Sequence, residues 1–265
     1  VNLEGLPEPD WSGFDIDLCR IQDISRHNKK LKRGALSGNF FTLTLTGLRG
    51  DKGLWQQSLE YIQANGVPNY FGEQRFGSQH ANLDKADKWF TENRKPKKRH
   101  QRSIILSAAR SWLFNLVLSE RVEQGYWNQW LEGDVMLLAG TRSSFFVAEN
   151  NDTDIQYRLA TFDIHPTGPL WGRGTPLNQG HSLVLEQEAL QGWDAWQAGL
   201  EQAGLKQERR SLRLHPEAMA WQFEKDTLTL SFYLPAGSYA TAVLRELALI
   251  TDISKGNSAS GDFSH

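Results

Sequence analysis

The sequence predicts an α/β fold of the α+β type, in which two strand–helix units form one sheet that a long mixed stretch interrupts. Two segments support this prediction. Residues 40–46 read Phe-Phe-Thr-Leu-Thr-Leu-Thr, and residues 227–233 read Thr-Leu-Thr-Leu-Ser-Phe-Tyr. Such alternation of apolar and polar side chains is typical of β-strands. A helical pattern follows each segment, so the two units can belong to a single sheet.

The helix of the first unit is expected over residues 52–65, where Asn65-Gly66 is a typical C-terminal stop. Its buried face is expected to carry four residues at helical spacing, namely Leu54, Ser58, Leu59 and Ile62.

The segment 67–77 shows no clean period and is rich in glycine and aromatic residues, which favours a functional loop. Asn69 offers a donor and an acceptor to a base edge, and Arg75 offers a fork that fits phosphate. An aromatic ring such as Phe71 can stack on a base, which contributes about 1–3 kcal/mol. The alternative is that the aromatic side chains of this loop are ordinary core residues.

The middle of the chain is expected to hold a helix over 103–122, capped by Ser103, and strands within 133–148. Proline and glycine predict a loop over 165–180, and a helical segment follows over 183–203.

The helix of the second unit begins near Gly237-Ser238-Tyr239-Ala240-Thr241, where Ser238 is expected to be the N-cap. Helix N-termini bind phosphate readily, and Tyr239 can pack on a base. The alternative is a plain N-cap beside a buried tyrosine.

The formal net charge of the 265 residues is only -2, but cations are concentrated in two runs. Residues 26–33 hold five Lys or Arg and residues 94–102 hold six, with no acid in either run. A phosphate backbone requires such clusters, and the alternative is two solvated loops. The candidate RNA-binding residues are Lys29, Lys30, Lys32, Lys97, Lys98 and Arg99.

Several protein classes are excluded by what the sequence lacks. No run of 18 apolar residues and no signal peptide occur, and the single Cys19 favours a reducing, cytoplasmic compartment. No zinc spacing, phosphate-binding loop or nucleophile elbow is found. Scattered carboxylates with His27 leave a nuclease or phosphoryl-transfer enzyme as a weaker alternative.

Four blocks in chain order resemble the TruD family of tRNA pseudouridine synthases. The central block, Asn-Tyr-Phe-Gly-x-Gln-Arg-Phe-Gly, is long and specific. The four blocks are Arg26-His27 with Lys30-Leu31 and Gly34–Asn39, Gly66–Gly77, Leu106–Ser111 with Leu113–Asn115, and Leu234–Thr241 with Leu244–Glu246.

The resemblance implies a pseudouridine-synthase core with a mixed or antiparallel sheet, interrupted by an inserted TRUD domain. The core would comprise residues 1–94 and 215–265, and the insertion residues 95–214. The implied activity converts uridine to pseudouridine in tRNA, at position 13 of the D-arm in bacterial members. No metal or cofactor is implied, and tRNA is the expected partner of a monomer.

The resemblance also implies roles for individual residues. Phe71 would stack on the target uracil, Asn69 would hydrogen-bond the substrate, and Tyr239 would line the same pocket. Arg75 would neutralise a nearby carboxylate or phosphate.

The catalytic aspartate of the family lies in a Gly-x-Lys-Asp segment ahead of the Arg26-His27 block. No Gly-x-Lys-Asp occurs in residues 1–265. We therefore expect an N-terminally truncated chain that is inactive alone, with no catalytic residue among these 265. The alternative is a non-catalytic RNA-binding protein that uses the same pocket.

Overall fold

The computed structural model describes residues 36–141, 144–146 and 153–248. Every element below lies within the structural unit Gly38–His265. Lys29, Lys30 and Lys32 lie outside the described residues, as do Cys19 and His27.

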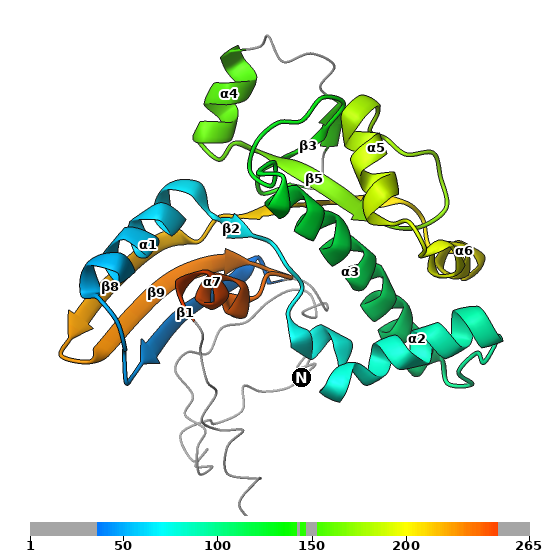
Figure 1. Ribbon diagram of the computed structural model, residues 1–265, viewed down its shortest axis with the longest axis horizontal. Helices are drawn as coiled ribbons and strands as arrows, with labels where there is room; N and C mark the ends of the chain where they lie inside the picture. Colours follow the sequence, from blue (N-terminus) through cyan, green and yellow to red (C-terminus); the bar gives the residue numbers. More distant parts are fainter. Residues whose placement is uncertain (1–35, 142–143, 147–152, 249–265) are drawn as a thin grey trace, which may run out of the picture. The chain divides into compact units, whose positions relative to one another are not determined.

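The two strand–helix units share one antiparallel sheet, as predicted. Strand β1 (Gly38–Leu45) pairs along its whole length with β9 (Thr227–Pro235), and β9 pairs with β8 (Glu217–Glu224). Segments almost 190 positions apart in sequence are thus neighbours in space (Figure 1). The fold class is confirmed.

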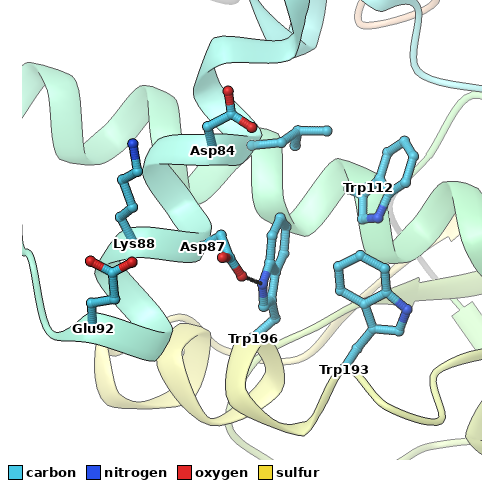
Figure 2. Close-up of a pocket in the computed structure, with 8 residues that line it drawn as sticks. Asp84, Asp87, Lys88, Glu92, Trp112, Trp193 and Trp196 are labelled. Carbon is cyan, nitrogen blue, oxygen red and sulfur yellow. Dashed lines mark hydrogen bonds between the residues drawn. The ribbon is translucent and has the colours of Figure 1, made fainter.

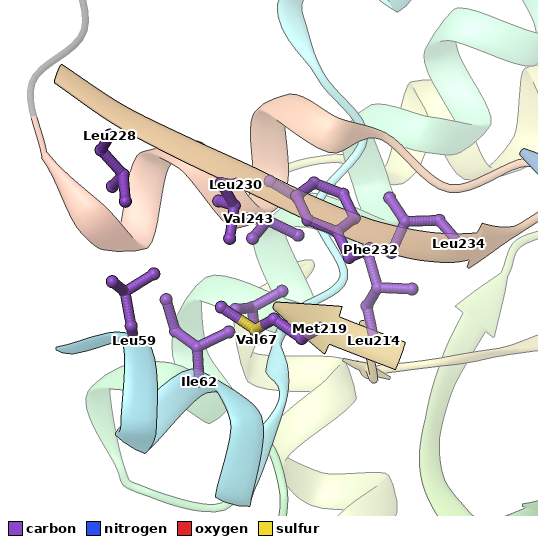
Figure 3. Close-up of a cluster of buried hydrophobic side chains, with 11 residues drawn as sticks. Leu59, Ile62, Val67, Leu214, Met219, Leu228, Leu230, Phe232, Leu234 and Val243 are labelled. Carbon is purple, nitrogen blue, oxygen red and sulfur yellow. The ribbon is translucent and has the colours of Figure 1, made fainter. Parts of the chain in front are cut away.

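Helices α1 (Lys52–Asn65) and α7 (Ala240–Leu247) pack against one face of this sheet (Figure 3). Alternate side chains of β9 point at the helices because successive strand residues face opposite sides. The core consists of Leu59, Ile62, Val67, Leu214, Met219, Leu228, Leu230, Phe232, Leu234, Ala242 and Val243. Leu54 was expected on this face but is 62% exposed, and α1 contacts the core through Trp55, Leu59 and Ile62 instead.

A second antiparallel sheet has the order β4-β3-β5-β6. Its strands are β3 (Val135–Leu138), β4 (Ser144–Phe146), β5 (Ile164–Leu170) and β6 (Glu208–Ser211). The short strands β2 (Val67–Pro68) and β7 (Arg213–Leu214) pair with each other beside the first core.

Helix α3 (Arg99–Glu123) runs against β5 and is buried over much of its length. A core of apolar side chains joins it to three neighbouring helices. The remaining helices are α2 (Ala81–Glu92), α4 (Thr153–Ala160), α5 (Gly180–Ala189) and α6 (Asp194–Gln202), with 3-10 turns at Glu73–Phe76 and Ser78–His80.

The prediction of a loop over 165–180 was wrong in its first half, which forms β5. Proline lacks an N–H but keeps its carbonyl acceptor. The Pro166 carbonyl accepts the Leu212 N–H at 2.8 Å, and β5 is paired on both sides, with β3 and β6. Pairing and burial therefore override the local signal of the prolines.

Three helix boundaries also differ from prediction. Helix α3 starts at Arg99, so Ser103 lies inside it and is not its cap. Tyr239, not Ser238, is the N-cap residue of α7, and no side chain caps that helix. The helical segment 183–203 is two helices, because the chain turns at Gly192, which has a φ of 85°.

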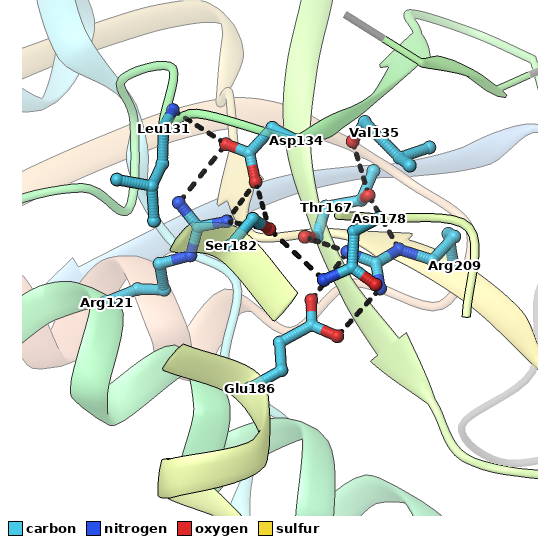
Figure 4. Close-up of polar contacts among 9 residues, drawn as sticks. All are labelled: Arg121, Leu131, Asp134, Val135, Thr167, Asn178, Ser182, Glu186 and Arg209. Atoms are coloured by element: carbon cyan, nitrogen blue, oxygen red, sulfur yellow. Dashed lines mark hydrogen bonds and ion pairs between the residues drawn. The ribbon is translucent and has the colours of Figure 1, made fainter. Parts of the chain in front are cut away.

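Two buried ion pairs fix the helices to the second sheet (Figure 4). Arg121 of α3 binds Asp134, and both side chains are fully buried. The Asp134 carboxylate also accepts the Leu131 N–H at 2.9 Å and the Ser182 hydroxyl at 2.7 Å. Arg209 of β6 binds Glu186 of α5 at 2.7 Å. Every charge in these pairs is therefore compensated, as buried charges require.

A third buried cluster surrounds Arg213 of β7. Its guanidinium donates to the carbonyls of Leu159 and Ile164 at 2.8 and 2.9 Å, and to Nδ1 of His165 at 3.2 Å. Burial, together with the Arg213 charge, lowers the pKa of His165 from about 6.5 to about 3. His215 and Asp163 also lie near, the first lowering and the second raising this pKa. His165 is therefore neutral in the folded protein at physiological pH.

This buried histidine predicts loss of stability in acid. The unfolded chain takes up the proton as the pH falls below about 6.5, whereas the folded protein does so only near 3. The free energy of unfolding should therefore decrease across this window, by up to about 1.4 kcal/mol per pH unit. Urea unfolding from pH 7.5 to 4.5 measures it. His165→Gln, which keeps an acceptor for Arg213, should flatten the dependence; an unchanged slope would contradict the assignment.

None of the helices in the described ranges is long and apolar enough to cross a membrane. The domain boundaries after residues 94 and 214 stay predictions.

Candidate functional site

Arg210 lies at the centre of the candidate site. Along β6, Arg209 points to Glu186, and Arg210 points to the opposite side of the strand. The Arg210 Nη2 donates to Asn69 Oδ1 at 2.7 Å and to the Gly237 carbonyl at 3.2 Å. It therefore connects the loop after β2 to the turn before α7.

The Phe71 ring forms the inner wall of the site. The Arg210 Cζ lies 4.1 Å from the ring centroid, in a cation–π contact. Phe114 of α3 and Tyr239 contact the ring edge-on, with centroids 5.5 and 6.2 Å away. Phe71 is 7% exposed. A base can therefore stack on Phe71 only where the neighbouring side chains leave the ring accessible or move aside. This role of Phe71 stays a prediction.

Helix α3 fixes the backbone of this loop. The Asn115 Oδ1 accepts the Phe71 N–H at 2.9 Å, and the Asn115 Nδ2 donates to the Phe71 carbonyl at 3.0 Å. Ser111, Phe114 and Asn115 share one helical face because residues three and four apart are neighbours. The Ser111 hydroxyl accepts from Arg75 Nε at 3.3 Å.

The four residues predicted for substrate binding come together around Arg210. Asn69 is buried: its Nδ2 donates to the Ser211 carbonyl at 2.9 Å, and its N–H donates to the Leu212 carbonyl at 2.8 Å. The Arg75 Cζ lies 5.5 Å from the Phe71 centroid. Tyr239 reaches the same ring from the far end of the chain. Their contacts with a substrate stay predictions.

Comparison with known proteins identifies the family. The family model for tRNA pseudouridine synthase D (TruD) matches residues 3–94 and 90–247, which is nearly the whole chain. The chain belongs to the TruD family.

The chain is closely similar to individual TruD proteins. The chain is 48% identical to the tRNA pseudouridine synthase D of Nitrosococcus oceani, over 93% of this chain and 70% of that protein. It is 46% identical to that of Xanthomonas campestris, over 96% of this chain and 73% of that protein. A crystal structure assigned to TruD, from Methanosarcina mazei, superposes with a TM-score of 0.66 at 20% identity, covering 87% of this chain and 74% of that one. That likeness supports the fold.

Sequence reasoning missed Arg210 and gave Asn115 no role. Glu208–Ser211 carries four polar residues in a row and has no alternation that would predict a strand. Asn115 belongs to a TruD block, but nothing in the sequence indicated that it holds the backbone of Phe71. The candidate site therefore depends on residues that only the three-dimensional structure reveals.

The second basic run lies at the start of α3. Lys97, Lys98 and Arg99 are all exposed, and Arg94 pairs with Glu92 at 2.9 Å. The first turn of α3 holds no acid, and the N-cap Lys98 makes no side-chain cap bond. Cations at a helix N-terminus oppose the helix dipole, so helix stability does not explain their placement.

A cavity of about 450 Å³ lies between α2, α3 and α6 (Figure 2). Its lining residues are Leu83, Asp84, Asp87, Lys88, Glu92, Trp112, Trp193 and Trp196. Trp196 Nε1 donates to Asp87 Oδ1 at 3.0 Å. Three carboxylates and one ammonium group line this cavity, so its lining disfavours phosphate, and it is distinct from the site around Arg210.

Proposed function

We propose that this chain serves the conversion of uridine to pseudouridine in tRNA, at position 13 of the D-arm, and that Asn69, Phe71, Arg75 and Tyr239 hold the target nucleotide. The observation that carries the proposal is the convergence of these residues, from positions 69–75 and 239, on the one Phe71–Arg210 contact. Membership of the TruD family supports the same activity.

The reaction is an isomerisation. The bond from N1 of uracil to C1′ of the ribose breaks, the base rotates, and C5 bonds to C1′. C5 loses one proton and N1 gains one, so no co-substrate is consumed. The base must first leave the RNA stack, and an aromatic pocket with a polar edge can hold it there. The exposed Lys97, Lys98 and Arg99 would contact the phosphate backbone.

We infer that the catalytic carboxylate of the family is not among these 265 residues, because they contain no Gly-x-Lys-Asp motif. We expect the chain alone to release no tritium from unmodified tRNA labelled at uracil C5. A fusion that adds the family's Gly-x-Lys-Asp segment ahead of residue 26 should release it. Release by the unfused chain would mean that another carboxylate acts. Binding of tRNA without release by either form would favour a non-catalytic RNA-binding protein.

Phe71→Ala tests the pocket within the active fusion. Loss of base stacking should reduce kcat/KM by roughly 5- to 150-fold, which corresponds to about 1–3 kcal/mol. The Kd for tRNA should change by less than about threefold, because phosphate contacts dominate affinity. Tyr157→Ala is the matched control, since Tyr157 is an exposed aromatic residue of α4. Unchanged turnover would remove Phe71 from the pocket.

A further inference from the structure

Two guanidinium groups approach the Phe71 ring, and neither has an anionic partner among the described residues. Arg210 Cζ lies 4.1 Å and Arg75 Cζ 5.5 Å from the ring centroid. Neutral acceptors take only part of their hydrogen-bonding capacity. Arg210 uses Nη2 for Asn69 and Gly237, and Arg75 uses Nε for Ser111.

Three other arginines with little exposed surface are paired with carboxylates, whereas the buried Arg213 binds only two backbone carbonyls and His165 Nδ1. Arg121 binds Asp134, Arg209 binds Glu186, and Arg110 binds Glu208 at 3.3 Å. Arg210 has no carboxylate partner in the described ranges, and its buried Nε meets no acceptor there, which is also true of the Nε atoms of Arg110 and Arg121. A buried donor without an acceptor is costly, and a buried charge is normally compensated. The site therefore has the character of an anion site.

The charge state fits the same conclusion. Burial lowers the pKa of Arg210 to about 10, with Tyr239 opposing and Arg75 reinforcing the shift. Arg210 stays protonated at neutral pH, and Arg75 adds a second positive charge close by. Two cations that repel each other beside one ring are stabilised by an anion that both can contact.

We propose that Arg210 and Arg75 bind a phosphate group of the nucleotide whose base enters the pocket. A guanidinium fork matches the planar, bidentate recognition of phosphate. The rings of Phe71 and Tyr239 beside the two cations suit a ligand that carries an aromatic base and a phosphate together. This inference rests on the proposed function, which supplies the uridine.

The test is the affinity of the 265-residue chain for uridine, uridine 5′-monophosphate and uridine 3′-monophosphate, measured by calorimetry at constant ionic strength. One monophosphate should bind at least about tenfold more tightly than uridine. Arg75→Gln should remove most of that preference while changing the affinity for uridine less than about twofold. Arg210→Lys, which keeps the charge but not the fork, should remove part of it.

Arg94→Gln is the matched control, because Arg94 is exposed and paired with Glu92; it should leave the preference intact. Thermal unfolding shows whether each variant is folded. If Arg210→Lys does not fold, Arg75→Gln alone tests the proposal. Equal affinity for uridine and both monophosphates would overturn the phosphate site, as would a preference that survives Arg75→Gln. So would inorganic phosphate binding as tightly as the preferred monophosphate.

The choice of base separates this inference from the proposed function. Cytidine monophosphates that bind as well as uridine monophosphates, with the same dependence on Arg75, would leave the phosphate site standing and contradict uridine recognition. The preference of the pocket for uracil over cytosine and the preference for phosphate are thus read from different pairs of ligands.

Discussion

Asp134→Ala should decrease the free energy of unfolding by about 3–5 kcal/mol. The substitution leaves the Arg121 guanidinium charged and fully buried with no carboxylate (Figure 4). It also removes the acceptor of the Leu131 N–H and of the Ser182 hydroxyl. The loss is large because a buried charge without a counterion keeps its full desolvation cost. Urea unfolding at pH 7.5, followed by circular dichroism, measures the difference.

Asp163→Ala is the matched control, because Asp163 binds Arg158 at 2.6 Å with its side chain 47% exposed. Water replaces a lost partner at such a position, so the expected cost is about 0–1 kcal/mol. Adding Arg121→Met to Asp134→Ala should recover part of the stability by removing the unpaired charge. Equal losses at Asp134 and Asp163 would show that burial of the first pair has no energetic consequence.

Phe232→Ala should decrease the free energy of unfolding by about 3–5 kcal/mol as well. Phe232 is fully buried in β9, packs beside Phe41 of β1 with ring centroids 5.7 Å apart, and faces α1 and α7 (Figure 3). Alanine would leave a cavity between the sheet and its helices, because close-packed neighbours relax only in part.

Phe40→Ala supplies the control within the same sheet, since Phe40 of β1 is 62% exposed. Its expected effect is within about 0.5 kcal/mol, the usual range for a surface position. The two variants lose the same atoms and differ in which face of the sheet they lie on. A Phe40→Ala loss comparable to that of Phe232→Ala would mean that the outer face of β1 is covered in solution.

The sequence predicted β1 and β9 of the first sheet and β3 and β4 of the second, and it missed β5, β6 and β8. Strands β1 and β9 each have one buried face, so apolar residues alternate with threonine and serine along them. Strand β5 is paired on both sides and carries Pro166 and Pro169, which usually indicate a loop. Burial and pairing with two neighbouring strands stabilise β5 as a strand, and a short segment of sequence reveals neither.

The sequence predicted four residues of the candidate site but not Arg210. Asn69, Phe71 and Arg75 lie in one unusual segment, and Tyr239 lies in a second. Arg210 was missed because its role arises from contacts across 141 positions of sequence, to Asn69. A pair of arginines in a polar stretch is an ordinary surface pattern, and only burial distinguishes this one. Long-range convergence of that kind has no local signature.

The neighbouring Arg209 and Arg210 have a consequence for how β6 finds its partner during folding. A slip of one residue exchanges the two faces of a strand, which normally buries a polar side chain where an apolar one belongs. Here such a slip would replace one arginine with another on each face, so charge alone disfavours the shifted register only weakly. Discrimination must come from Leu212, which is fully buried, and from Gly168, where an added Cβ would lie 2.9 Å from the Leu212 side chain. The close fit of Leu212 against Gly168 therefore favours the native register of β6 over one shifted by a single residue.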